Sequence, residues 1–70
     1  MREIPSLVEE LRIAAAYAQK VRIKLKTGEI IEGTAQLSGD RNRAKVRTED
    51  GSLWIPYEEI ELVERLIKLN

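Results

Sequence analysis

The sequence has no cysteine and no histidine among its 70 residues. A chain without these side chains forms no disulfide, offers no thiol nucleophile or zinc site of the usual Cys/His type, and lacks a base that titrates near neutral pH. Phenylalanine is also absent, and no apolar run is long enough to span a membrane. We therefore expect a protein that is not an enzyme and holds no metal or cofactor.

What the sequence does contain indicates one folded domain, residues 1–70. Apolar residues make up 43% of the chain and charged residues 34%, which is too apolar for a disordered segment. A chain this short buries only about 60% of the surface that its unfolded form exposes, so its core must be small. The first residues, Met1 to Pro5, lack the apolar region of a signal peptide, and we expect a cytoplasmic location.

The net charge of zero conceals a separation of charge along the chain. Residues 20–47 carry eight basic and three acidic side chains, whereas residues 48–70 carry two basic and six acidic ones. The middle segment could present a positive field to phosphate groups. Alternatively, rows of opposite charge lie side by side on neighbouring strands and neutralise one another.

A helix is predicted over residues 6–19. Ser6 and Glu9 have the spacing of a capping box, in which each side chain bonds to the backbone amide of the other residue. One helical arc is apolar and rich in alanine, so it can lie close to a sheet. Ile13 and Tyr17 lie outside this arc, four residues apart. They form either a second contact surface or a pair of exposed apolar side chains.

From Lys20 onward the apolar period changes from 3.6 to 2, which indicates strands. Five strands are predicted, with a bend at Gly33, a hairpin at Asp50-Gly51 and one helical turn after Pro56. Their predicted inward side chains are Val21, Ile23, Leu25, Ile31, Leu37, Ala44, Val46, Leu53, Ile55 and Ile60.

The order of elements predicts a mainly β domain with an N-terminal α-helix, in which residues 21–63 form a small, strongly bent, SH3-like barrel. A flat five-stranded sheet of this size would leave two long edges and one face uncovered. We therefore expect the strands to curl into a closed cylinder, followed by a C-terminal extension over residues 64–70.

Residues 21–33 form an alternating strand, a turn at Gly28 and a second strand with Gly33 five residues later. Together with the preceding helix, this pattern resembles the Sm-like superfamily, which includes the Sm and LSm proteins and bacterial Hfq, over nearly the whole chain. The resemblance implies a ring of subunits, in which the fourth strand of one barrel pairs with the fifth of the next. It also implies binding of single-stranded RNA.

Two segments are similar to particular members of this superfamily. The helix and first hairpin resemble the Rof-like proteins, which bind the transcription termination factor Rho. Residues 55–60, Ile-Pro-Tyr-Glu-Glu-Ile, resemble the end of YolD-like small barrels. These similarities imply a protein partner in place of RNA.

Candidate RNA-binding residues follow from the basic middle segment. In Sm proteins the loop after the second strand carries an Asp and an Asn that reads a base, and here Asp40 and Asn42 occupy that loop. Two guanidinium groups in the same loop can pair with phosphate or stack on bases. The full candidate set is Lys24, Lys26, Asp40, Arg41, Asn42, Arg43, Lys45 and Arg47. The alternative for the strand residues is a solvated face that binds nothing.

A second set of residues is predicted to contact another subunit or a partner. Trp54 is out of phase with its inward neighbours, so simple alternation directs it outward, where a tryptophan often marks a contact surface. The set is Ile13, Tyr17, Trp54, Tyr57, Glu58 and Glu59. For Trp54, the alternative is cover by another segment of the same subunit.

Three functional hypotheses follow. In the first, an oligomeric Sm-like module binds single-stranded RNA through the basic loop and strand face. In the second, a Rof-like adaptor uses Glu58 and Glu59, with Glu61 and Glu64, to meet the basic surface of a nucleic-acid-binding protein. In the third, the chain is a designed small barrel with no natural function, because balanced charge, a clean capping box and strict alternation are also features of design.

Overall fold

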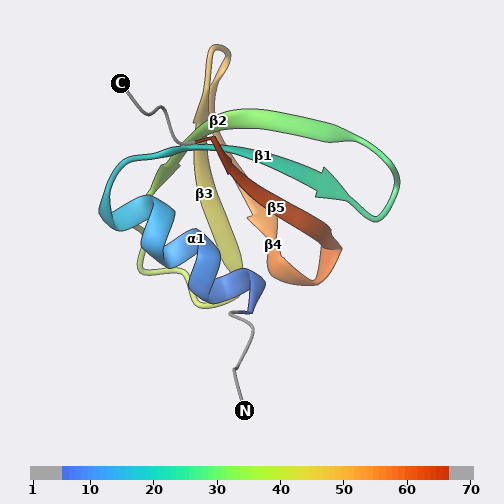
Figure 1. Ribbon diagram of the computed structural model, residues 1–70, viewed down its shortest axis with the longest axis horizontal. Coiled ribbons are helices and arrows are strands. Elements are labelled where there is room, and N and C mark those ends of the chain that lie inside the picture. Colours follow the sequence, from blue (N-terminus) through green and yellow to red (C-terminus); the bar gives the residue numbers. More distant parts are fainter. Residues whose placement is uncertain (1–5, 67–70) are drawn as a thin grey trace.

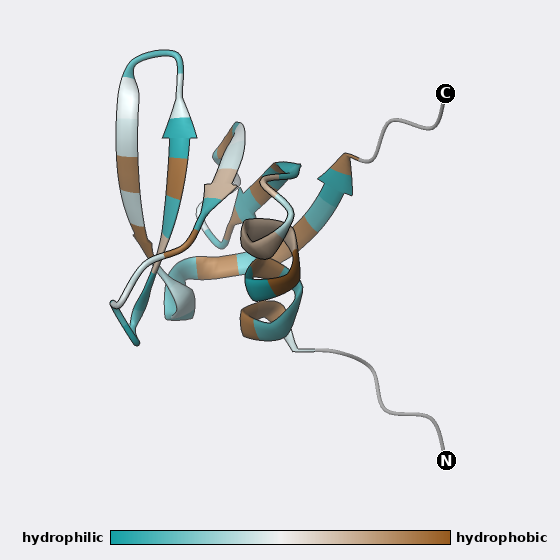
Figure 2. Ribbon diagram, turned by 90° about the vertical axis from the view of Figure 1, so that its left-hand side faces the viewer, coloured by the Kyte–Doolittle hydropathy of each residue, from teal (hydrophilic) through white to brown (hydrophobic). Residues whose placement is uncertain are grey.

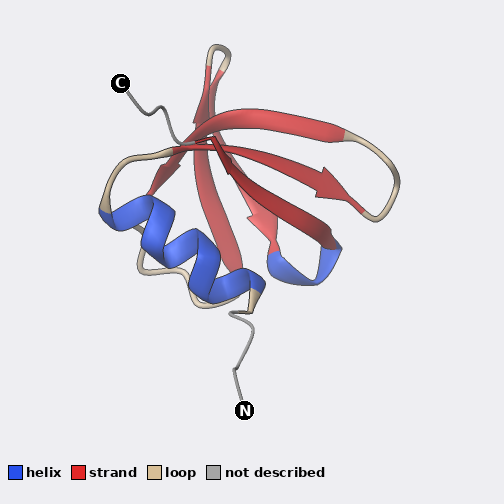
Figure 3. Ribbon diagram, in the orientation of Figure 1, coloured by secondary structure: helices blue, strands red, loops and turns tan. Residues whose placement is uncertain are grey.

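The computed structural model describes residues 6–66. One helix precedes five strands, with a single 3₁₀ turn before the last (Figures 1 and 3). The elements are α1 (Leu7–Ala16), β1 (Lys20–Leu25), β2 (Ile30–Gln36), β3 (Arg43–Thr48), β4 (Gly51–Pro56), η1 (Tyr57–Glu59) and β5 (Ile60–Leu66). The predicted class, mainly β with an N-terminal helix, is confirmed.

Two predicted boundaries differ from the structure. The helix ends at Ala16 rather than at residue 19. Its last turn is closed by the backbone amide of Gln19, which donates to the carbonyl of Ala14 at 2.8 Å, while Ala18 adopts a φ of 50°. This left-handed conformation ends an α-helix. At the other end, β5 runs to Leu66, so the first part of the predicted extension is strand; residues 67–70 lie outside the described residues, as do residues 1–5.

The five strands form one antiparallel sheet in the order β4-β3-β2-β1-β5. The bend lies in β2, whose first part pairs with β1 and whose last part pairs with β3. Gly33 is placed at this bend because a Cβ atom there would collide with the carbonyl oxygen of Arg47 and lie 2.7 Å from Cγ1 of Val46. The structure therefore accounts for the glycine at position 33 by the close approach of β3, while the β1–β2 ladder runs through it without a shift of register.

The prediction that the strands close into a cylinder is wrong, because the first and last strands of the sheet do not pair within the described residues. β4 and β5 lie at opposite ends of the strand order, and no ladder joins them within residues 6–66. They are connected instead by η1, where the Tyr57 amide donates to the Asn42 carbonyl at 2.9 Å and the Lys26 amide donates to the Glu59 carbonyl at 2.9 Å. The barrel is thus strongly bent but has two free strand edges in the part that the structure describes.

The core lies between α1 and the concave side of the sheet. Leu11 and Ala14 of α1 are buried together with side chains from all five strands, and α1 packs against β2 and β5. Figure 2 shows apolar bands on the helix and on the strands that it faces. The buried strand residues are Val21, Ile23, Leu25, Ala35, Ala44, Val46, Ile55 and Ile60.

Two predicted core residues are exposed. Leu37 is 71% exposed because β2 ends at Gln36 and the chain there enters a loop. Leu53 is 41% exposed although it pairs with the buried Val46. Its strand lies at a sheet edge, in a hairpin that projects beyond the rest of the barrel (Figures 1 and 2). An alternating sequence pattern predicts the face of the sheet on which a side chain lies, but it does not predict whether another element covers that face.

Candidate functional site

The outward face of β1 is neutralised by the strands on either side. Arg22 lies opposite Glu32 of β2 and Glu64 of β5, and its Nε and Nη1 atoms approach their carboxylates at 2.7 and 3.1 Å. The hydrogen bond that Arg22 donates to Glu32, together with the negative charge of Glu32, raises the pKa of Arg22 above its ordinary value. Lys24 pairs with Glu61 at 3.4 Å. For Arg22 and Lys24, therefore, the second alternative is the correct one: side chains of opposite charge on neighbouring strands neutralise one another.

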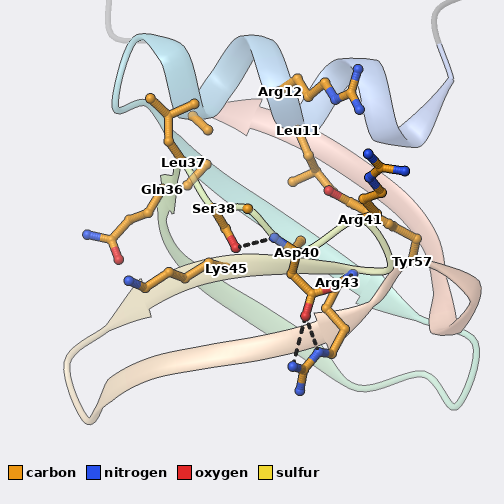
Figure 4. A pocket seen from close by; sticks show the side chains of 14 residues that line it. Leu11, Arg12, Gln36, Leu37, Ser38, Asp40, Arg41, Arg43, Lys45 and Tyr57 are labelled. Carbon is orange, nitrogen blue, oxygen red and sulfur yellow. Dashed lines mark hydrogen bonds and ion pairs between the residues drawn. The ribbon is translucent and has the colours of Figure 1, made fainter.

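The loop between β2 and β3 is organised by Asp40. Its Oδ1 accepts from the backbone amides of Asn42 and Arg43 at 2.8 and 3.1 Å, and its Oδ2 accepts from the Arg43 guanidinium at 2.8 Å. The Asp40 amide in turn donates to Ser38 Oγ at 3.0 Å (Figure 4). The hydrogen bond from the Asn42 amide, followed by that from Arg43, lowers the pKa of Asp40. The carboxylate that was predicted to contact RNA therefore holds the loop in shape.

The same loop meets η1. The Asn42 carbonyl accepts from the Tyr57 amide, and both segments line one open depression in the surface. Its lining consists of Asp40, Arg41, Asn42, Arg43, Pro56, Tyr57 and Glu58. The structure thus brings together residues that the sequence placed in two separate predicted sites. Lys24 and Lys26 do not line this depression.

A basic face with an exposed aromatic ring lies on the outer side of β3 and β4. Arg43, Lys45 and Arg47 alternate along β3, and the hairpin register places Trp54 directly opposite Lys45. The Arg43 guanidinium carbon and the Lys45 Nζ lie 5.4 and 5.3 Å from the centre of the Trp54 ring, within cation–π range. Trp54 is 43% exposed, which confirms its outward direction. We call these four residues the β3 face.

The charges of the β3 face are less compensated than those of β1. Arg43 is paired with Asp40, but neither Lys45 nor Arg47 has a carboxylate at ion-pair distance within residues 6–66. Arg41 is in the same position. Within the same residues Lys20, at the start of β1, and Lys26, just after its end, also lack such a partner. The unpaired positive charge of the middle segment therefore lies on β3, in the loop before it and at the two ends of β1.

Glu58 and Glu59 form the acidic turn, a name that we use for these two residues of η1. Both are exposed, and neither forms an ion pair within residues 6–66. Their predicted companions Glu61 and Glu64 are instead engaged by Lys24 and Arg22. The unneutralised acidic surface is thus smaller than the sequence suggested.

A cavity of about 190 Å³ lies between α1 and the loop before β3. Figure 4 shows Arg12 of α1 and Arg41 of the loop on the same side of it, with Tyr57 below. Small-molecule sites usually measure roughly 300–1,000 Å³, so this cavity is small for such a ligand. The sequence did not single out Arg12; only the packing of α1 against the loop places it here.

The remaining predicted contact residues are exposed, Ile13 on α1 and Tyr17 directly after its end, and they line neither the cavity nor the depression. The pairing of Trp54 with Lys45 was also missed by sequence reasoning. A two-residue turn at Glu49 and Asp50 pairs Thr48 with Gly51 and so sets the register of the whole hairpin. Counting back from this turn would have predicted that Trp54 lies opposite Lys45.

The helix and the strongly bent five-stranded sheet define a small β-barrel. Neither a family model nor a curated protein sequence matches the chain. Among solved structures, YaeO bound to magnesium from Vibrio cholerae O395 is similar, with a TM-score of 0.77 and 17% sequence identity over 93% of this chain and 90% of the YaeO chain. At this identity the likeness shows the fold alone, which is that of a small β-barrel.

Within residues 6–66, no helix has both the length and the apolar character needed to cross a membrane. In the same range, no three or more Asp, Glu, His or Cys side chains are grouped to hold a metal ion.

Proposed function

We propose that this chain is a non-enzymatic, cytoplasmic Rof-like adaptor that binds a nucleic-acid-binding protein through the acidic turn. The observation that carries the proposal is that Glu58 and Glu59 are exposed without ion-pair partners in residues 6–66, while the carboxylates of β5 are engaged. The fold likeness to YaeO supports it, as does the resemblance of the N-terminal half to Rof-like proteins, which bind Rho.

The chemistry of such a partner follows from the charge. A protein that binds nucleic acid has a basic surface to receive phosphates, and exposed carboxylates can occupy the same surface. The depression beside Glu58 adds Tyr57 and Pro56, whose half-buried side chains supply apolar contact. Charges at the rim of an interface mainly accelerate association and make it dependent on salt.

Binding to purified Rho, measured by biolayer interferometry over a series of salt concentrations, tests the proposal. We expect the double variant Glu58→Lys/Glu59→Lys to lose about tenfold or more in affinity, mostly through slower association. The matched control is Glu29→Lys/Glu49→Lys, which reverses two other exposed carboxylates and should leave affinity nearly unchanged. Equal losses of affinity in both double variants would show that only the net charge of the protein matters, and the acidic turn would then have no specific role. Unchanged binding by Glu58→Lys/Glu59→Lys would refute the proposal.

A second candidate function is binding of single-stranded RNA. The specific observation in its favour is the concentration of charge on β3, where Lys45 and Arg47 have no carboxylate partner in residues 6–66. Filter binding of a labelled oligonucleotide across salt tests it, because each phosphate neutralised adds to the slope of affinity against salt. Retention without a salt slope, or no retention, would reject this function.

Self-association belongs to the same candidate. The free edges of β4 and β5 are the ones that pair between subunits in Sm-like rings, so the resemblance supports an oligomer. Light scattering distinguishes the two functions: a ring of subunits favours the RNA-binding module and a monomer favours the adaptor.

A further inference from the structure

The Trp54 ring is held in place by cations that also face solvent. Arg43 is anchored from behind by Asp40, whose Oδ2 accepts from the Arg43 Nε at 2.8 Å, and its guanidinium carbon lies 5.4 Å from the ring centre. Lys45 approaches the same ring from the neighbouring position on β3. An aromatic ring with two cations at its surface can offer a nucleobase a stacking partner and its phosphates a counter-charge.

The ring is accessible because β4 is an edge strand. Among residues 6–66 no strand lies beyond β4 in the sheet order, and its hairpin projects from the barrel on the side away from α1 (Figures 1 and 2). An exposed cation–π contact is weaker than base stacking on an aromatic ring. A base can therefore displace a cation from the ring, and the freed cation can then pair with a phosphate.

The spacing of the cations suits an extended strand of nucleic acid. Arg43, Lys45 and Arg47 alternate along one face of β3, so that successive Cα atoms on this face are about 7 Å apart. A row of this kind follows a backbone without reading its sequence. In a duplex the faces of the bases are stacked on one another, so that only an unpaired base can reach Trp54.

We propose that the β3 face is a stacking platform for single-stranded nucleic acid, in which Trp54 stacks on one base while Lys45, Arg47 and the displaced Arg43 contact the adjoining phosphates. This inference rests on the second proposed function and narrows it. It assigns the base contact to Trp54, which the sequence placed at a protein interface, and gives Asp40 the role of positioning Arg43.

Trp54 is the only tryptophan in the chain, so intrinsic fluorescence reports on this site alone. We expect a short uridine oligonucleotide to quench the emission of the wild-type protein to saturation at low salt. The same backbone with abasic sites should bind more weakly and leave the emission unquenched. A matched duplex should not quench, and single-stranded DNA of equivalent sequence should quench as RNA does, because stacking and phosphate pairing need no 2′-hydroxyl.

Two variants, measured by anisotropy of a labelled oligonucleotide, separate the parts of the platform. Trp54→Leu should weaken binding by roughly 5- to 150-fold, the range expected for one stacked base. The control Tyr17→Leu removes an exposed aromatic ring at the C-terminal end of α1 and should have no effect. Lys45→Gln/Arg47→Gln should reduce the slope of log affinity against log salt by about 1.4, or 0.7 for each phosphate contact.

Each result bears on a different claim. Oligonucleotide binding without quenching, or with equal affinity for the abasic strand, would overturn the platform but leave RNA binding intact. No oligonucleotide binding at all would remove both. If Trp54→Leu instead abolished binding to Rho and left oligonucleotide affinity unchanged, the β3 face would be a protein contact and the inference would be wrong.

Discussion

Replacing Gly33 with alanine tests whether the bend of β2 depends on close contact between the strands. The added Cβ would collide with the Arg47 carbonyl oxygen and lie 3.1 Å from the Arg47 carbonyl carbon. Both are backbone atoms, which cannot move away without disturbing the pairing of Thr34 with Arg47 in the β2–β3 ladder. Overpacking of this kind costs about 1–3 kcal/mol, and a weakened backbone hydrogen bond adds about 1 kcal/mol.

A loss of about 2–4 kcal/mol is a large part of the total for a chain of this length, which is of the order of 4–10 kcal/mol. Thermal unfolding followed by circular dichroism should show the midpoint of Gly33→Ala lower by roughly 10–30 °C. The control is Gly39→Ala, because a Cβ at Gly39 meets no atom within 4 Å, and its midpoint should stay close to that of the wild type. If the two variants melted together, the close approach of β2 and β3 would not be the reason for this glycine.

Four further substitutions test other features by the same unfolding measurement. Ala18→Gly should raise the free energy of unfolding by up to about 1 kcal/mol. Glycine removes the strain of the left-handed backbone at φ 50°, and this gain exceeds the cost of the greater freedom of glycine in the unfolded chain. A loss of stability would contradict this account of the helix end. The pKa of Asp40 is lowered in the folded state, so its contribution is present above its unfolded pKa of about 3.9 and is lost as pH falls through the folded value. Asp40→Asn should therefore be less stable than wild type at neutral pH, and a difference that persisted at a pH low enough to protonate the Asp40 carboxyl would argue against the ionised form as its source. Ile55→Ala should lose about 2–5 kcal/mol and Leu53→Ala about 0.5 kcal/mol or less, since only Ile55 is buried; equal losses would place Leu53 back in the core.

Charge was the feature for which the sequence left two outcomes open, and the structure divides them between strands. The β1 cations meet acidic side chains from both neighbours because β1 lies between β2 and β5. The β3 cations lie between the outward polar side chains of β2 and the uncharged edge strand β4. One alternating basic pattern therefore has opposite consequences on two strands, depending on which strands lie beside it.

Local chemistry within the sequence determined much of this protein. The Ser6 cap, the change of period at Lys20 and the outward direction of Trp54 all follow from neighbouring residues or from alternation. These features depend on the conformations open to a few consecutive residues, so a single chain specifies them before any long-range contact forms.

Only the tertiary structure decided which of those residues act together. The meeting of the loop before β3 with η1, the exposure of Leu53 at an open edge and the pairing of Arg22 with both Glu32 and Glu64 depend on the order of strands in space. Strand order is set by the global packing of a small core against α1. Contacts between residues far apart in the chain result from that packing, and a local sequence pattern cannot predict them.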